Sequence, residues 1–127
     1  MSDLETSQQD NQILVIFRKA PAGSAWAREA LDLALVGAAF GQKVSLLFMG
    51  DGVFQLLEQQ NPKLIGQKGT QAMMQALPMY EIDNLYVEGH SLVERGLDLE
   101  QLAVNCQVLN ADEMPKLLQQ HQQVFNF

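Results

Sequence analysis

Apolar runs alternate with helix-like stretches along the first half of the chain. Residues 12–17 (QILVIF) and 43–49 (KVSLLFM) are almost continuously apolar, which is typical of strands buried on both faces. Between them, apolar positions at helical spacing predict a helix over residues 24–40, with Ser24 as its N-cap and Gly41 at its end. The order strand, helix, strand with short connections predicts a βαβ unit, and therefore parallel strands with a right-handed crossover.

The second half of the chain continues this alternation in shorter pieces. Residues 84–88 (NLYVE) and 103–109 (AVNCQVL) predict a third and a fourth strand, and the alternating residues 122–127 (QQVFNF) predict a closing edge strand. Short helical pieces are expected between the strands: 51–57 with Asp51 as its cap, 70–77 limited by Pro78, 91–95 after a turn at 89–91, and a last helix that begins at Asn110 or Ala111.

These elements predict an α/β fold, a three-layer sandwich with a mostly parallel sheet of about five strands. A length of 127 residues fits one domain, which we place at residues 12–127. Residues 1–11 (MSDLETSQQDN) are polar and acidic, so we expect a disordered N-terminal tail. The chain shows neither a signal peptide nor an apolar stretch long enough for a membrane span, which predicts a cytoplasmic protein.

Charge and cysteine usage narrow the classes of function. The net charge is −7 and the eight basic residues are scattered, which weighs against direct nucleic acid binding and leaves a basic partner open. A single cysteine excludes an intramolecular disulfide and a multi-cysteine metal site, and it is consistent with a reducing compartment.

Motifs for cofactor binding are missing from the places where this fold would hold them. Partners and ligands of parallel sheets lie at the carboxyl ends of the strands, here residues 18–23, 50–54, 88–91 and 109–111. The loop after the first strand has one glycine and one hydroxyl, Ser24, and no glycine-rich phosphate loop is present. We therefore assign no cofactor, no metal site and no catalytic residue.

Three features of the sequence have alternative interpretations. Cys106, in the middle of the predicted fourth strand, is expected to be a buried structural thiol, and the alternative is a nucleophile or persulfide carrier. His90, at a strand end, is either a solvated loop residue or part of a polar pocket at an interface. Methionines cluster at Met73, Met74 and Met79, and core packing is expected for at least two of them; an exposed apolar face near Met79 and Tyr80 would instead indicate a subunit interface.

A set of short motifs resembles one known family. The motifs are residues 20–23 (APAG), 28–32 (REALD), 51–57 (DGVFQLL), 80–82 (YEI) and 91–97 (SLVERGL). In this order and spacing, over residues 12–127, the chain is similar to the DsrE/DsrF/DsrH family, and within it to the DsrF/TusC-type subunit. The resemblance implies a DsrEFH-like, flavodoxin-like arrangement of the sheet.

The resemblance also implies a role in sulfur relay. TusB-, TusC- and TusD-like chains of that family form a heterohexamer, a dimer of heterotrimers, which passes persulfide sulfur toward 2-thiolation of the wobble uridine in certain tRNAs. Related DsrEFH complexes serve sulfur oxidation. The family's sulfur-carrying cysteine belongs to the TusD/DsrE-type subunit and lies just after the third strand, where this chain has residues 87–91 (VEGHS) and no cysteine.

Three hypotheses follow for the function. The first is a non-catalytic subunit that binds TusB/DsrH-like and TusD/DsrE-like chains. The second is an independent persulfide carrier through Cys106, and the third is a small-molecule-binding module at the strand-end crevice. Whether the isolated chain self-associates stays open.

Overall fold

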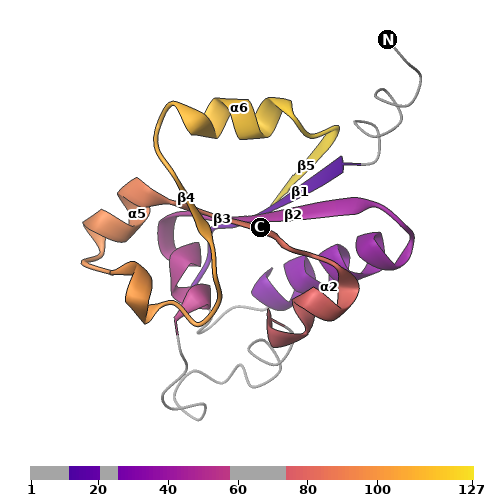
Figure 1. Cartoon of the computed structure of the whole chain (residues 1–127), viewed down its shortest axis with the longest axis horizontal. Helices are drawn as coiled ribbons and strands as arrows, with labels where there is room; N and C mark the ends of the chain where they lie inside the picture. The colour runs from indigo at the N-terminus through magenta and orange to yellow at the C-terminus, as the bar shows by residue number, and fades with distance from the viewer. Residues whose placement is uncertain (1–11, 21–25, 58–73) are drawn as a thin grey trace.

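Five strands form one sheet in the order β4-β3-β2-β1-β5, and all four neighbouring pairs are parallel (Figure 1). The structure is a computed structural model, and it describes residues 12–20, 26–57 and 74–127. The strands are β1 (Gln12–Phe17), β2 (Lys43–Phe48), β3 (Asn84–Glu88), β4 (Gln107–Leu109) and β5 (Gln123–Asn126). The predicted three-layer α/β fold with a parallel sheet of about five strands is confirmed.

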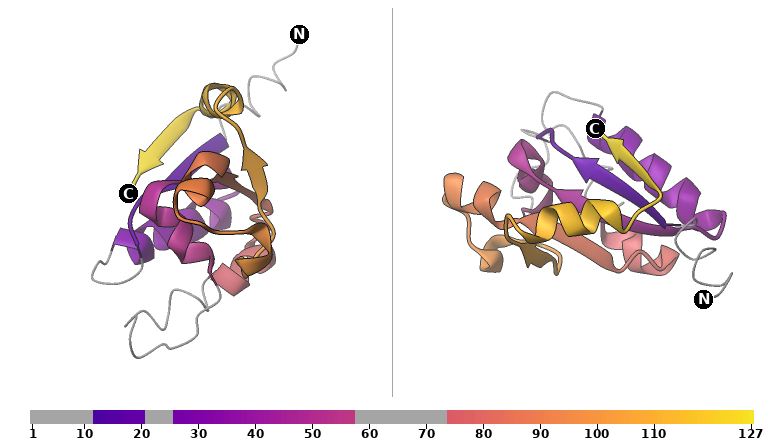
Figure 2. Two further views of the ribbon diagram at one scale, coloured as in Figure 1. Left: turned by 90° about the vertical axis from the view of Figure 1, so that its left-hand side faces the viewer. Right: turned by 90° about the horizontal axis from the view of Figure 1, so that it is seen from above.

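Helices cover the two faces of this sheet unequally. The helix α2 (Trp26–Ala39) and the short helices η1 (Gly50–Leu56) and η2 (Leu77–Tyr80) pack on one face, whereas α6 (Glu113–Gln119) crosses the other (Figures 1 and 2). The helix α5 (Gly89–Glu94) follows β3 directly, and η3 (Leu99–Gln101) leads from it toward β4. None of the described helices has the length and apolar character needed to cross a membrane.

The larger part of the core lies under α2. Side chains of β1 and β2 alternate between the two faces, so Phe17 and Phe48 meet on the α2 side, where their rings stack with centroids 4.7 Å apart. On the α6 side, a smaller cluster includes Leu14, Leu47 and Leu117. Both strands are therefore buried on two faces, as their continuous apolar runs predict.

Several predicted boundaries agree with the structure. The strands β1 and β3 begin and end at the predicted residues. The helix α2 ends at Ala39, and Gly41 follows with φ of 86°, a conformation that favours glycine. The last helix, in contrast, starts later than the predicted Asn110 or Ala111. Its first residue is Glu113, although the Asn110 side chain accepts the Glu113 N–H and the Glu113 carboxylate accepts the Asn110 N–H just before it.

The predicted fourth strand over residues 103–109 is wrong in its first half, because β4 begins only at Gln107. The backbone before it has other partners: the Ala103 N–H donates to the Leu56 carbonyl at 2.7 Å, and Leu102 forms an isolated antiparallel bridge with Leu57. These bonds hold the chain against the end of η1, so only its last three residues reach β3.

Other local predictions change in smaller ways. No turn precedes α5, which starts at Gly89. Asp51 makes no capping bond in η1, whose N-cap is Met49. Pro78 stands at the start of η2 and does not end the helical stretch that reaches it. Residues 1–11, Ser24 and the first part of the predicted helix over residues 70–77 lie outside the described residues.

Candidate functional site

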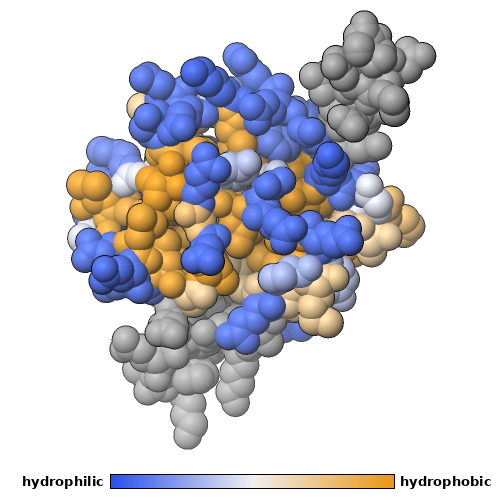
Figure 3. Space-filling view, in the orientation of Figure 1, coloured by the Kyte–Doolittle hydropathy of each residue, from blue (hydrophilic) through white to orange (hydrophobic). Residues whose placement is uncertain are grey.

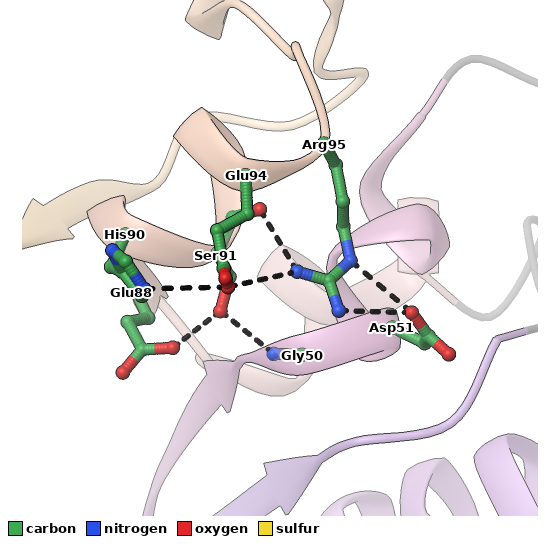
Figure 4. Close-up of polar contacts among 7 residues, drawn as sticks. All are labelled: Gly50, Asp51, Glu88, His90, Ser91, Glu94 and Arg95. Atoms are coloured by element: carbon green, nitrogen blue, oxygen red, sulfur yellow. Dashed lines mark hydrogen bonds and ion pairs between the residues drawn. The ribbon is translucent and has the colours of Figure 1, made fainter.

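The carboxyl ends of β2 and β3 meet in a cluster of polar contacts (Figure 4). One side of the cluster is the start of η1, with Gly50 and Asp51, and the other is the segment from Glu88 to Arg95 at the end of β3 and along α5. In a parallel sheet, ligands and partners bind at the carboxyl ends of the strands. The carboxyl ends of β2 and β3 are therefore the candidate site. Its chemistry depends on which of its polar side chains are not already engaged in hydrogen bonds.

Ser91 lies at the centre of the cluster and is fully engaged. Its Oγ accepts the Gly50 N–H at 2.8 Å and donates to the Glu88 carboxylate, and the residue is only 2% exposed. A nucleophilic serine needs access to its substrate and a base that takes its proton. Ser91 therefore connects α5 to the end of β2 and is not placed to act as a nucleophile.

Arg95 adds a second connection between the same two segments. Its Nε and Nη2 donate to Asp51 Oδ1 at 3.2 and 3.0 Å, and its Nη1 donates to the Ser91 carbonyl at 3.2 Å. Motifs 51–57 and 91–97, which carry much of the sequence resemblance, thus bind one another. Their contact gives a structural reason for the two motifs to occur together in one chain.

Gly52 brings η1 against the end of β1. A Cβ atom at this position would lie 1.9 Å from the Phe17 carbonyl oxygen, so a side chain cannot be accommodated without moving one backbone segment. The same carbonyl accepts the Met49 N–H at 3.0 Å. Gly52 is therefore needed because two backbone segments approach closely there. In the sequence this role is visible only as a glycine shortly after a predicted strand.

Gln55 reaches the loop after β1. Its Nε2 donates to the Lys19 carbonyl at 3.1 Å, whereas its buried Oε1 has no hydrogen-bond partner within the described part of the chain. An unpaired buried acceptor is costly, so an N–H or O–H donor from a bound molecule would be stabilising there. The sequence offered no signal for this residue beyond its place in motif 51–57.

His90 is exposed and stands in the first turn of α5, not in a loop. Its Nε2 lies 3.4 Å from a carboxylate oxygen of Glu94, one helical turn further along, and 74% of its side chain is exposed. Among the described residues, no group of three or more His, Cys, Asp or Glu side chains could hold a metal ion.

Cys106 does not lie within a strand, contrary to the prediction. It immediately precedes β4, at the amino ends of β3 and β4, and lines an open pocket of about 300 Å³ together with Tyr86 and Asn105. The side chain is half-buried, and this burial raises the pKa of the thiol to about 12. The only thiol of the chain thus lies at the amino ends of the strands, and the candidate site lies at their carboxyl ends.

Met79 and Tyr80 form an exposed apolar surface on η2. Met79 is 85% exposed and Tyr80 is exposed as well, whereas Met74 and Leu77 just before them are buried. Core packing is therefore confirmed for Met74, Met73 lies outside the described residues, and the exposed face at Met79 and Tyr80 is what a subunit interface would show.

Similarity to known proteins covers nearly all of the chain. The model of the DsrE/DsrF-like family matches residues 11–127. A TusC homolog of Pseudomonas aeruginosa is 48% identical over 112 residues, which cover 88% of this chain and 94% of that protein. The intracellular sulfur oxidation protein DsrF of Allochromatium vinosum is 35% identical over 135 residues, covering 95% of this chain and 99% of that protein.

A solved structure shares the fold. The ychN protein from E. coli matches with a TM-score of 0.75 at 21% sequence identity, covering 91% of this chain and 98% of that one. At this identity the likeness concerns the fold alone. The family match and the two relatives, in contrast, extend over the sequence itself, and the chain therefore belongs to the DsrE/DsrF-like family.

Proposed function

We propose that this chain is a non-catalytic subunit of a TusBCD/DsrEFH-like sulfurtransferase complex that relays persulfide sulfur. Its relatives include a TusC homolog and the sulfur oxidation protein DsrF, and the identity to the TusC homolog is higher. This difference favours the TusC type and therefore 2-thiolation of the wobble uridine of tRNA in the cytoplasm. The net charge of −7 supports a role in which other chains contact the tRNA.

One observation carries the proposal. The segment after β3, where the family's sulfur-carrying subunit has its cysteine, contains Glu88, His90 and Ser91 and no thiol in this chain. The hydroxyl of Ser91 is buried and bonded on both sides, so it offers no replacement nucleophile. A chain with this segment can hold and shelter a partner's persulfide but cannot carry one there.

Cys106 is a poor substitute for the missing cysteine. Persulfide transfer requires a thiolate, and a pKa near 12 leaves almost none at neutral pH. The residue also lies at the amino ends of the strands, away from the segment that carries sulfur in the related subunit. These facts weigh against the alternative of an independent persulfide carrier.

The proposed partners are TusB/DsrH-like and TusD/DsrE-like chains in a heterohexamer. Exposed apolar side chains such as Met79 and Tyr80 support a subunit that is covered in an assembly. Co-expression with the two small homologous chains of the same cell, followed by native mass spectrometry, tests the assembly. We expect two copies of each chain, and purification of this chain without either partner would contradict the proposal.

Sulfur transfer by the assembled complex tests the non-catalytic role. A Cys106→Ser chain should support transfer from a persulfide donor at the rate of the unchanged complex. In the complex with the original chain, mass spectrometry should find the added sulfur on the DsrE-like chain. A gain of about 32 Da on Cys106 that a thiol reductant removes would establish the carrier alternative instead, since a persulfide adds one sulfur atom whereas two added oxygens resist reduction.

A second candidate, a small-molecule-binding module, is favoured only by the unpaired Gln55 Oε1. A ligand N–H or O–H at the strand-end crevice would satisfy this acceptor. Thermal shift against flavins and nucleotides tests it: stabilisation that disappears in Gln55→Leu would support it, and no shift would dismiss it.

A further inference from the structure

An apolar groove lies beside α5, outside the polar cluster of the candidate site. It has a volume of about 540 Å³ between α5, η3 and β4, and its apolar side chains include Val93, Leu97, Leu99 and Val108. Apolar surface gathers over this side of the molecule in Figure 3. We call this feature the β4 groove.

The apolar side chains of the β4 groove are unusually open to solvent. Val93 is 77% exposed, Leu99 is 53% exposed and Val108 is 38% exposed, although other residues of the same elements, such as Leu92 and Leu109, are buried. In addition, β4 pairs with β3 only and stands at the edge of the sheet. Contiguous exposed apolar side chains next to a sheet edge are typical of a surface that another chain covers.

The charges around the groove define what kind of chain fits it. Asp98 and Glu100 line the groove, and Glu94 is exposed next to Val93. The one arginine of this region, Arg95, has its guanidinium bound to Asp51 and the Ser91 carbonyl. The rim is therefore acidic, and its complement is a segment with apolar side chains flanked by Lys or Arg.

The same charges weigh against a second copy of this chain as the occupant. A twofold contact centred on the groove would bring two acidic rims, each with Asp98 and Glu100, to the same interface. Like charges held together at the rim of an interface disfavour the contact. The occupant is thus a different chain with a basic rim.

We propose that the β4 groove binds an apolar segment of a partner chain through Val93 and Leu99, with Lys or Arg of that segment contacting Asp98 and Glu100. This inference rests on the proposed function in one respect, since it expects the segment to belong to one of the two homologous subunits. It goes beyond that function by naming the surface and the chemistry of the contact.

Paired variants test the apolar part of the contact in the co-expressed complex. Val93→Ser/Leu99→Ser should weaken binding of one partner by about tenfold or more, because truncating a central apolar contact costs over 1 kcal/mol. Val124→Ser/Leu118→Ser makes the same exchanges at side chains that are also exposed, on β5 and α6, and should leave binding unchanged. Equal binding by both variants would overturn the proposal.

Neutral variants test the charges. Asp98→Asn keeps an N-cap for η3, where the Asp98 side chain accepts the Gln101 N–H, and Glu100→Gln keeps the length of its side chain. The double variant should bind about threefold more weakly at low salt and should lose most of the salt dependence of binding. An unchanged salt dependence would contradict a basic partner segment.

Photo-crosslinking separates failure of this proposal from failure of the proposed function. A photoreactive side chain is placed at Leu99, or at Leu118 as the control, in the full chain within its own cells. Crosslinks that form from Leu99 but not from Leu118, to an apolar segment with Lys or Arg, support the proposed binding at the β4 groove. If that segment belongs to an unrelated protein, the groove proposal holds while the sulfur-relay function fails. Crosslinks to a second copy, to an acidic segment, or equally from Leu118 would overturn the groove while an intact heterohexamer keeps the function.

Discussion

The two ends of the β3–β4 region differ in how firmly their side chains are held. At the carboxyl end, Ser91 and Arg95 bind the start of η1 through several hydrogen bonds, and Ser91 is buried. At the amino end, Cys106 is half-buried beside an open pocket, and the backbone before it makes an isolated bridge instead of a strand. Firmly bonded polar groups thus occupy the carboxyl end of this region, and the thiol lies at its amino end.

This difference indicates that the two ends of the region respond differently to substitution. The contacts of Ser91 and Arg95 hold α5 in place whether or not a reactive group is present. Groups that are already held in place lose less conformational entropy when another molecule binds next to them. Variants at the two ends should therefore have very different consequences.

Gly52→Ala should have the largest effect on stability. The added Cβ would meet the Phe17 carbonyl oxygen at 1.9 Å, and neither backbone segment can move without breaking β1 or η1. We expect a loss of about 4 kcal/mol in the free energy of unfolding, measured by urea denaturation. The matched control is Gly96→Ala, where φ is 65° and no atom lies within 4 Å of an added Cβ, so about 1 kcal/mol is expected. Equal losses at the two glycines would refute the close approach.

Ser91→Ala should follow in size. The change leaves the Gly50 N–H without its acceptor and the Glu88 carboxylate without its donor in a buried setting. Loss of about 2–3 kcal/mol is expected in the same unfolding measurement. His90→Ala, on the adjacent exposed position, should change stability by less than about 0.5 kcal/mol. A neutral Ser91→Ala would mean that the carboxyl end is held by Arg95 alone.

The Asp51–Arg95 pair should contribute less, because 61% of the Asp51 side chain is exposed. A double-mutant cycle with Asp51→Asn and Arg95→Gln should give a coupling of about 0.5–1 kcal/mol at low salt. In 1 M salt the coupling should fall, since solvent screens a pair that is open on one side. A coupling that salt leaves unchanged would show that the hydrogen-bond geometry, not the charge, holds the two motifs together.

Sequence patterns predicted the fold better than they predicted the site. Continuous apolar runs located β1 and β2 because burial on both faces leaves no room for polar positions, and the sheet followed from the order of the elements. The fourth strand was extended too far because residues 103–106 have strand-like composition. Ala103 instead bonds to Leu56, and the preceding Leu102 bridges Leu57, over forty positions earlier in the chain; local patterns do not contain such contacts.

The same limit applies to the candidate site. The motifs 51–57 and 91–97 were visible as motifs, but the bonds of Ser91 and Arg95 to Gly50 and Asp51 depend on how the sheet places two distant segments. Exposure of Val93 and Leu99 was hidden for a related reason. An apolar residue is typical of a core position in a sequence. The packing of α5 against η1 and β3, which buries Leu92 and leaves Val93 exposed, is not visible there, and neither is the exposure of Leu99 on η3.

Cys106→Ser should change stability by no more than about 1 kcal/mol at neutral pH, because the side chain is only half-buried. At alkaline pH the two chains should diverge. The thiol has a pKa of about 12 in the folded chain and an ordinary value of 9.0 when unfolded, so the folded state binds the proton more tightly. Stability that depends on the neutral thiol is therefore fully present below pH 9 and is lost as the pH rises toward 12. Urea midpoints of the original chain should fall between pH 8 and pH 10.5 more steeply than those of Cys106→Ser.

Alkylation of Cys106 by iodoacetamide at pH 8 tests whether the amino end of the sheet offers a usable thiolate. The raised pKa lowers the thiolate fraction about a thousandfold relative to an unfolded thiol. Greater nucleophilicity of the more basic thiolate recovers part of this, so the folded chain should react about thirtyfold more slowly than the chain in urea. Mass spectrometry of the modified peptide over time measures both rates. A folded chain that reacts as fast as the unfolded one would place a usable thiolate at the amino end of β4, and the independent carrier would then replace the supporting subunit as the better account of this chain.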